Sequence, residues 1–272
     1  MTRPRRPSAG PRRRVSVTAL LAAVWTSATL AVLYVVCVRT VEGQLHENAL
    51  HSRALQTPDG NGVGWLERLF SVTSRLEPQH LLVAFAAVAL LGLVRGAWTR
   101  GAMGVLVAGG TLAVTELLKL VVLERPDLSE RYGAIANSLP SGHTSAVLGL
   151  ALGALVAAPR FLRWPVALLG AVAAGAMGAY VIDDGWHRVS DVLASALVAS
   201  ACLCLVLALP GRHRPRTSGL VGLAAGVPVA SAVALAVVYA WPGTGMTAAV
   251  VVPGAVVALT VLLAVRALPR GA

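Results

Sequence analysis

The most regular feature of the sequence is a series of long apolar runs separated by short polar segments. Eight such runs are present, at 15–38, 80–98, 102–123, 143–159, 164–183, 192–209, 218–241 and 246–265. A helix needs about 20 residues to cross a hydrocarbon core of roughly 30 Å. The runs are continuous in Ala, Leu, Val and Gly and lack the alternation of a membrane barrel. The pattern therefore predicts an all-α fold, a polytopic bundle of membrane helices.

The composition excludes a water-soluble domain. Of 272 residues, 56% are hydrophobic and only 13% are charged, which leaves too little polar surface for a soluble chain of this length. The first run, 15–38, is longer than the apolar part of a secretory signal and no small-residue cleavage site follows it, so we expect an uncleaved anchor. The three cysteines lie within apolar runs, where we expect them to be buried, and no disulfide or zinc spacing is present.

The net charge of +11 is distributed unevenly. Basic residues without any acidic neighbour occupy the N-terminal tail 1–14, every second connection and the C-terminus. They are Arg3, Arg5, Arg6, Arg12, Arg13, Arg14, Arg95, Arg100, Arg160, Arg163, Arg212, Arg214, Arg216, Arg266 and Arg270. The positive-inside rule then predicts a multi-pass protein of the cell membrane with both termini in the cytoplasm, where arginines meet anionic lipid head groups. A nucleic-acid partner is not expected.

A segment of about forty residues, 39–79, separates the first two runs on the external side. It contains a turn at 58–62, followed by apolar residues at helical spacing between Trp65 and Leu76. We expect an amphipathic helix there, lying in the membrane interface or packed on the protein surface. Its histidines have no recognisable partner spacing, and we assign them no role.

Three polar clusters fall on this external side. The first contains Lys119, the only lysine in the chain, with Glu116 one turn before it and Arg125-Pro126 after it. Ionisable groups at membrane depth are costly and usually line a wet cavity. The alternative is that Lys119 extends to the interface and pairs with Glu116.

The second cluster, Pro140-Ser141-Gly142-His143, precedes an apolar run. Ser141 is a preferred N-cap, Gly142 allows close approach of another group, and the start of a helix attracts anions. The third cluster contains His187 and Asp191, four residues apart, which places them on one face of a helix. An imidazole held by a carboxylate has a defined tautomer, and its free nitrogen can act as a nucleophile or base.

Together the clusters resemble the three motifs of the type 2 phosphatidic acid phosphatases, which share their site with acid phosphatases and vanadium haloperoxidases. The resemblance spans about 119–191 and implies a six-helix phosphatase core that binds phosphate without a metal or other cofactor. It implies the following roles. Lys119 and Arg125 bind the phosphate, Ser141 and Gly142 cradle it, His143 is the general acid, His187 is the nucleophile and Asp191 orients it.

Two departures from the family pattern concern the phosphate-binding cations. Five residues instead of six separate Lys119 from Arg125, which on an α-helix rotates the lysine by about 100°. The third motif usually begins with Ser-Arg, where this chain has Tyr180-Val181. Arg188 is a candidate replacement for the missing arginine, although a residue adjacent to His187 on a helix would point about 100° away from it.

The domain organisation that follows is a basic tail at 1–14, a phosphatase core at 15–209 and two additional membrane helices with a short basic tail at 210–272. We expect those last helices to pack against lipid or another subunit. The leading functional hypothesis is a phosphatase that removes phosphate from a lipid phosphate or a polyprenyl (pyro)phosphate on the external face, through a phosphohistidine. Alternatives are a phosphotransferase, a metal-dependent hydrolase using Asp183, Asp184, His187 and Asp191, and a non-catalytic lipid-phosphate binder or transporter. The oligomeric state is left open.

Overall fold

The computed structural model describes residues 15–56, 78–93, 98–128, 137–210, 214–240 and 246–269. Within these ranges the chain is helical and contains no strand, which confirms the all-α bundle. The helices are α1 (Val17–Val38), α2 (Val41–Leu55), α4 (Pro78–Leu93), α5 (Trp98–Leu117), α6 (Gly142–Ala157), α7 (Arg163–Asp183), α8 (Val189–Ala208), α9 (Thr217–Ala240) and α10 (Met246–Ala267). A π-helical turn, η2 (Leu118–Val122), extends α5, and a 3-10 turn, η3 (Arg160–Leu162), precedes α7.

Each of the eight predicted apolar runs forms a helix. Six helices of the described chain are long and apolar enough to cross a membrane, counting α5 with η2 and α7 with η3. The other two, α4 and α6, are shorter. With 16 residues, α6 extends about 24 Å, less than the thickness of a typical hydrocarbon core.

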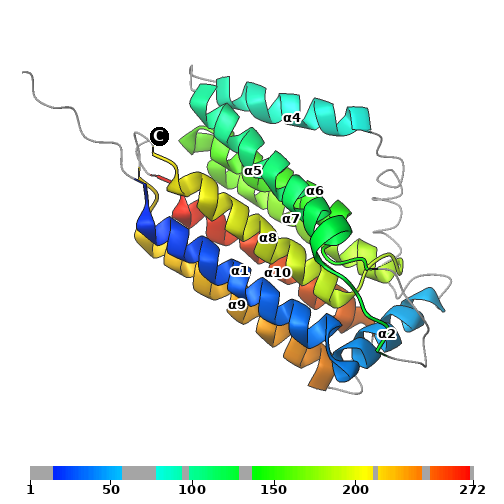
Figure 1. Ribbon diagram of the computed structural model, residues 1–272. Helices are drawn as coiled ribbons and strands as arrows, with labels where there is room; N and C mark the ends of the chain where they lie inside the picture. Colours follow the sequence, from blue (N-terminus) through cyan, green and yellow to red (C-terminus); the bar gives the residue numbers. More distant parts are fainter. Residues whose placement is uncertain are drawn as a thin grey trace, which may run out of the picture.

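Helix α8 lies at the centre of the bundle, surrounded by α1, α5, α6, α9 and α10 (Figure 1). Its most apolar stretch is 94% buried, as expected of a helix that is hydrophobic on all sides. The first turn of α8 carries Asp191. The central position of this helix therefore places the third polar cluster in the middle of one end of the bundle.

The last two helices pack inside the chain and do not form an appendage. Helix α10 packs against α7 and α9, and α9 also contacts α1. The α7–α10 contact is close because a Cβ on Gly254 would lie only 2.6 Å from the backbone oxygen of Gly175. The expectation that α9 and α10 pack against lipid or another subunit is thus wrong for these faces, since small residues let the helices approach each other within the bundle.

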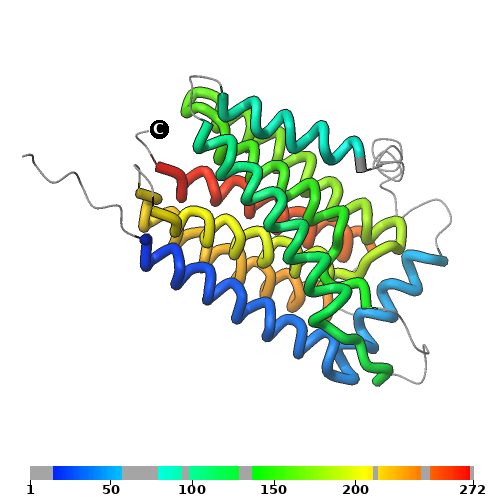
Figure 2. The backbone as a smooth tube through the Cα atoms, turned by 45° about the horizontal axis from the view of Figure 1, so that its top comes forward, coloured from blue at the N-terminus to red at the C-terminus, as the bar shows by residue number. Residues whose placement is uncertain are grey.

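The two ends of the bundle differ (Figures 1 and 2). The starts of α1 and α7 and the ends of α8 and α10 lie at one end. Hydrogen bonds there run from Ser16 N to Ala208 O at 3.0 Å and from Arg163 Nη1 to Pro269 O at 2.6 Å. Helix α2 lies at the opposite end. We call the first of these the arginine end, because it carries Arg100, Arg160, Arg163, Arg216 and Arg266. We call the opposite end, where α2 lies, the site end.

Segment 39–79 contains a helix that the sequence did not predict. Helix α2 begins after Thr40, whose Oγ1 accepts a hydrogen bond from Gly43 N at 3.1 Å. Gly43 permits a sharp turn against α1, because a Cβ there would lie 2.0 Å from Val36 O. As a result α2 folds over the site end. The amphipathic helix predicted near residues 65–76 lies outside the described residues.

Candidate active site

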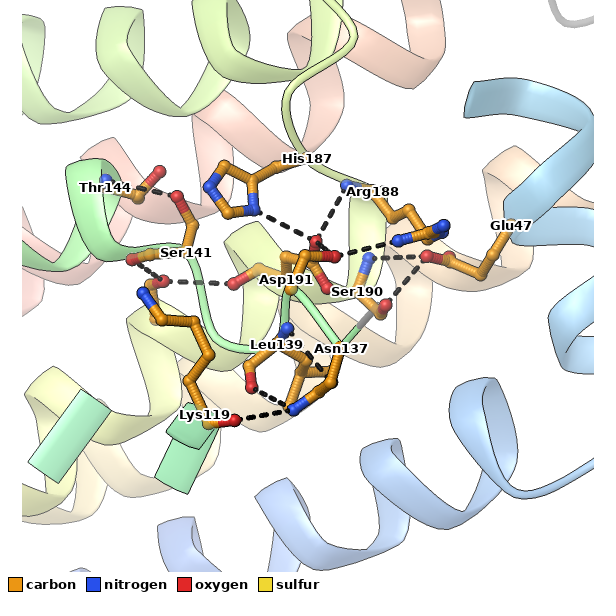
Figure 3. Close-up of polar contacts among 12 residues, drawn as sticks. Glu47, Lys119, Asn137, Leu139, Ser141, Thr144, His187, Arg188, Ser190 and Asp191 are labelled. Atoms are coloured by element: carbon orange, nitrogen blue, oxygen red, sulfur yellow. Dashed lines mark hydrogen bonds and ion pairs between the residues drawn. The ribbon is translucent and has the colours of Figure 1, made fainter. Parts of the chain in front are cut away.

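The centre of the site is the buried carboxylate of Asp191, which is 0% exposed (Figure 3). Its Oδ2 lies 3.1 Å from His187 Nδ1 and accepts hydrogen bonds from Arg188 N at 3.0 Å and Ser138 Oγ at 2.7 Å. An ionised carboxylate can only accept, so the contact requires a proton on Nδ1 of His187. This tautomer leaves the lone pair of Nε2 free.

The predicted contact between His187 and Asp191 is present, although not as a pair on one helical face. Helix α8 begins at Val189, so His187 lies before the N-cap residue Arg188. Asp191 is the third residue of the helix and closes the first turn by accepting from the N-cap backbone. The same carboxylate therefore caps the helix and orients the imidazole.

The starts of α6 and α8 are tied together. Ser141 is the N-cap of α6, as predicted, and accepts a hydrogen bond from Thr144 N at 3.3 Å. Ser141 N in turn donates to Asp191 O at 3.1 Å, and Ser195 Oγ donates to the carbonyl oxygens of both Ser141 and Asp191 at 3.0 Å. Two helix N-termini thus lie side by side, and their dipoles favour an anion at the site end.

Lys119 lies against the start of α6. A Cβ on Gly142 would lie 3.3 Å from Lys119 Nζ and 2.9 Å from Glu116 Oε1. Lys119 and Glu116 form an ion pair of 2.7 Å. The lysine therefore reaches the expected helix start, and it also has the acidic partner that the alternative interpretation named. Glycine at position 142 makes room for both groups.

The rotation expected for Lys119 from α-helical geometry does not apply. Lys119 lies in the π-helical turn η2, in which Leu123 N donates to Leu118 O at 2.8 Å. A π turn contains more residues than an α turn, so angles counted at 100° per residue are wrong here. Asn137 Nδ2 donates to the carbonyl oxygens of Lys119 and Leu123 at 3.2 and 2.9 Å, which satisfies carbonyls at the end of this helix.

His143, in the first turn of α6, lies near the other histidine. Its ring packs beside Trp186, with centroids 5.1 Å apart and planes inclined at 52°. It interacts electrostatically with His187 and with the Lys119–Glu116 pair. The structure thus brings the two predicted catalytic histidines into one neighbourhood at the site end.

Two arginines converge on one amide oxygen. Arg125 Nη2 and Arg188 Nε donate to Oδ1 of Asn48, at 2.9 and 3.1 Å, and Arg188 Nη1 donates to Ser138 Oγ at 2.8 Å. The angle of about 100° between Arg188 and His187 expected for neighbours on a helix does not apply, because Arg188 precedes α8 and is not helical. Its backbone is extended, with φ −91° and ψ 166°. Arg188 is therefore free to turn toward Arg125.

Each guanidinium retains one nitrogen without a partner. Arg125 Nη1 and Arg188 Nη2 are buried and donate to no acceptor among the described residues. Burial, and then the positive charge of Arg188, lower the pKa of the Arg125 guanidinium. Buried donors without acceptors are costly, and a guanidinium fork matches the geometry of phosphate oxygens. This pair is therefore suited to phosphate.

Sequence reasoning missed the contribution of α2. Besides Asn48, this helix supplies Glu47, which is 1% exposed and accepts from Ser190 N and Oγ at 3.3 and 2.7 Å and from the Tyr239 hydroxyl. Burial raises the pKa of Glu47. His51 has a buried Nδ1 without a partner among the described residues, and burial followed by the charge of Arg188 lowers its pKa to about 4.

One signal could have indicated this face of α2. Gln44, Glu47, Asn48 and His51 are spaced by three or four residues, the spacing of one helical face. Within the described ranges, no group of three or more His, Cys, Asp or Glu residues is placed to hold a metal ion. The four residues considered as metal ligands therefore do not gather into such a group.

Residues 100–215 match the family model of the PAP2 superfamily. The matched region contains all three polar clusters, while α2, α9 and the whole of segment 39–79 lie outside it. Comparisons with curated proteins and with solved structures gave no match. The predicted family resemblance is thus confirmed for residues 100–215, and with the membrane-span helices it supports a membrane phosphatase in general.

Proposed function

We propose that this chain, with its PAP2 region at residues 100–215, is an integral membrane phosphatase that hydrolyses a lipid phosphate or a polyprenyl (pyro)phosphate. One observation carries the proposal. His187, held by Asp191, lies at the same end of the bundle as two guanidinium groups that each present an unpartnered buried nitrogen. A held nucleophile next to unsatisfied cationic donors is the arrangement that phosphoryl transfer requires.

In the first step the phosphate binds to Arg125, Arg188 and Lys119, with the start of α6 around Ser141 and Gly142 completing the cradle. The lone pair of His187 Nε2 then attacks phosphorus. The N–P bond forms, the P–O bond to the lipid breaks, and His143 donates a proton to the departing oxygen. Asp191 stabilises the positive charge that develops on the imidazole of His187.

In the second step water hydrolyses the phosphohistidine. His143, now neutral, accepts a proton from the water molecule while its oxygen attacks phosphorus and the N–P bond breaks. Inorganic phosphate leaves, and both histidines return to their starting protonation states. The cations of the site supply the charge stabilisation that a metal ion supplies in other phosphatases, so the reaction needs no cofactor.

The surroundings of Lys119 support a lipid substrate. Leu120 and Val121, which follow it in η2, are 72% and 74% exposed. Such exposed apolar side chains next to a phosphate-binding cation suit a molecule with a charged head and a hydrocarbon tail. In the proposed orientation the arginine end lies in the cytoplasm, against anionic lipids, and the site end faces the external compartment.

The test is a phosphate-release assay on the protein purified in detergent, with a panel of phosphorylated lipids and with a chelator present. We expect the wild-type protein to release phosphate from at least one lipid and His187→Ala to lose turnover by about 10³-fold or more, since it lacks the nucleophile. Undiminished activity of His187→Ala would remove the assigned nucleophile, and complete loss of wild-type activity with EDTA would contradict the metal-free mechanism.

The same assay separates the remaining alternatives. A phosphotransferase would form a new phosphoester when alcohols or lipid-linked acceptors are added, in place of inorganic phosphate. A non-catalytic binder would retain a phosphorylated lipid without releasing phosphate from any member of the panel. Either result would contradict the hydrolase.

A further inference from the structure

The contact between α2 and the arginines goes beyond the PAP2 region. Asn48 is 3% exposed, and its Oδ1 accepts one hydrogen bond from Arg125 and one from Arg188. The two arginines come from segments far apart in the sequence, one after η2 and the other at the start of α8. Asn48 therefore joins three elements at one oxygen atom.

This shared oxygen counteracts an unfavourable electrostatic arrangement. Two guanidinium groups repel each other, and the repulsion is strong where water is largely excluded. A neutral amide oxygen between them places a partial negative charge next to each guanidinium. Each guanidinium keeps its full positive charge. It also directs the remaining nitrogens, because a planar guanidinium with one edge bound can rotate little. Arg125 Nη1 and Arg188 Nη2 are left for a further acceptor.

Asn48 is itself held firmly by its neighbours on α2. Glu47 anchors the helix to Ser190 of α8 and to Tyr239 of α9. Gln44 Nε2 donates to Pro126 O at 2.6 Å, which fixes the chain directly after Arg125. Helix α2 thus positions both the amide of Asn48 and the segment that carries one of its arginines.

We propose that Asn48 is a positioning residue that assembles Arg125 and Arg188 into a single phosphate-binding fork. In this fork Arg188 fulfils the function of the arginine that the third motif lacks at Val181. The inference rests on the proposed function and deepens it, because it assigns the second phosphate-binding cation and the residue that holds it. It also makes the external helix α2 a part of the phosphate site.

The experiment measures binding of inorganic phosphate by calorimetry to the full chain in detergent, which does not depend on turnover. We expect Asn48→Ala and Arg188→Ala each to weaken phosphate binding by about tenfold, the loss of roughly one hydrogen bond to a charged group. Because part of the effect of Asn48 acts through Arg188, the loss in the double variant should be smaller than the sum of the two single losses. In turnover, Asn48→Ala should raise KM more than it lowers kcat.

Two further variants separate positioning from stability. Ser52→Ala also removes a polar group from α2. Among the described residues its hydroxyl donates to the backbone carbonyls of Asn48 and Ala49 and not to the Asn48 side chain, so this variant should leave phosphate binding unchanged. Asn48→Asp retains the acceptor oxygen and should fold even if Asn48→Ala does not. It should still weaken phosphate binding, since the added negative charge neutralises part of the fork.

Several results would overturn the inference. These are unchanged phosphate binding in Asn48→Asp, additive losses in the double variant, or equal losses in Ser52→Ala and Asn48→Ala. Each leaves the proposed function standing as long as the wild-type protein binds phosphate and turns over a lipid. A wild-type protein that neither binds phosphate nor turns over any lipid of the panel would overturn the proposed function, and this inference with it.

Discussion

The ammonium group of Lys119 is already paired with an acidic side chain in the site. Its ammonium lies 2.7 Å from Glu116, and the two side chains are 21% and 39% exposed, respectively. A phosphate that approaches the start of α6 meets both groups, since they lie beside Gly142. At the scale of single residues, Glu116 therefore competes with the phosphate for Lys119.

Replacing the acidic partner should strengthen phosphate binding. In Glu116→Gln the ammonium of Lys119 loses its ion pair, and the repulsion between carboxylate and phosphate disappears. Because Glu116 is more than a third exposed, solvent screens these interactions, and we expect an increase in affinity of only about two- to fivefold. Calorimetric titration with inorganic phosphate measures it, with Glu42→Gln on α2 as the control. Unchanged or weaker binding would show that Glu116 does not compete.

His51 should make the protein less stable in mild acid. The pKa of His51 is lowered from 6.5 to about 4, so the unfolded chain binds its proton at a higher pH than the folded one. The contribution of His51 to the free energy of unfolding is fully present above about pH 6.5 and is lost as the pH falls toward 4. Burial is the main cause of the lowered pKa of His51, the positive charges of Arg188 and Arg125 lower it further, and the negative charge of Asp191 opposes them.

The measurement is the thermal unfolding midpoint in detergent between pH 7 and pH 4. The midpoint of the wild-type protein should fall more steeply with decreasing pH than that of His51→Gln. Glu47 has a raised pKa, so its contribution to stability is lost as the pH rises. Because Glu47 is present in both proteins, its contribution cancels in the comparison. Parallel curves for the two proteins would contradict the assignment.

At the scale of elements, close contacts between helices make α9 and α10 part of the bundle. The sequence indicates α9 and α10 as apolar runs without charge before Arg266, and such runs are compatible with lipid, with another subunit or with the same chain. The structure places α10 against α7 through Gly175 and Gly254. In α9, Tyr239 reaches the buried Glu47 of α2. The last two helices thus support the site indirectly.

A methyl group at the α7–α10 contact should destabilise the protein. In Gly254→Ala the new Cβ would lie 2.6 Å from a backbone oxygen of α7, so one helix must shift, at a cost of about 1–3 kcal/mol. Gly222→Ala in α9 is the matched control, because its Cβ would have no neighbour within 4 Å. We expect a lower thermal unfolding midpoint for the first variant, and an equal or slightly higher one for the second, because alanine favours helix.

At the scale of the whole molecule, the two ends of the bundle carry different chemistry. The arginine end joins the start of α1, the end of α8 and the C-terminal residues. The site end joins α2 with the starts of α6 and α8. In the proposed orientation the membrane separates the phosphate site from both termini.

Cysteine labelling tests this orientation with little background, since Cys37, Cys202 and Cys204 are buried. Leu55 in α2 is 63% exposed at the site end, and Leu209 after α8 is 51% exposed at the arginine end. A maleimide that cannot cross membranes should label Leu55→Cys in intact cells and Leu209→Cys only after permeabilisation. The reverse pattern would place the site in the cytoplasm.

The sequence alone determined the features that depend on local order. Runs of apolar residues predict the membrane helices because a bilayer demands a minimum helix length. The three polar clusters could be found because each is short and continuous in sequence. Ser141 as the N-cap of α6 is a prediction of this kind, and the structure confirms it.

Tertiary structure decided whatever depends on residues distant in sequence or on departures from α-helical geometry. Asn48 meets Arg125 and Arg188 across 77 and 140 positions, a contact that no local pattern records. The extended backbone of Arg188 and the π turn at Lys119 changed directions that had been counted at 100° per residue. Packing and hydrogen bonding around a buried end of the bundle set those angles, so they follow from the fold as a whole.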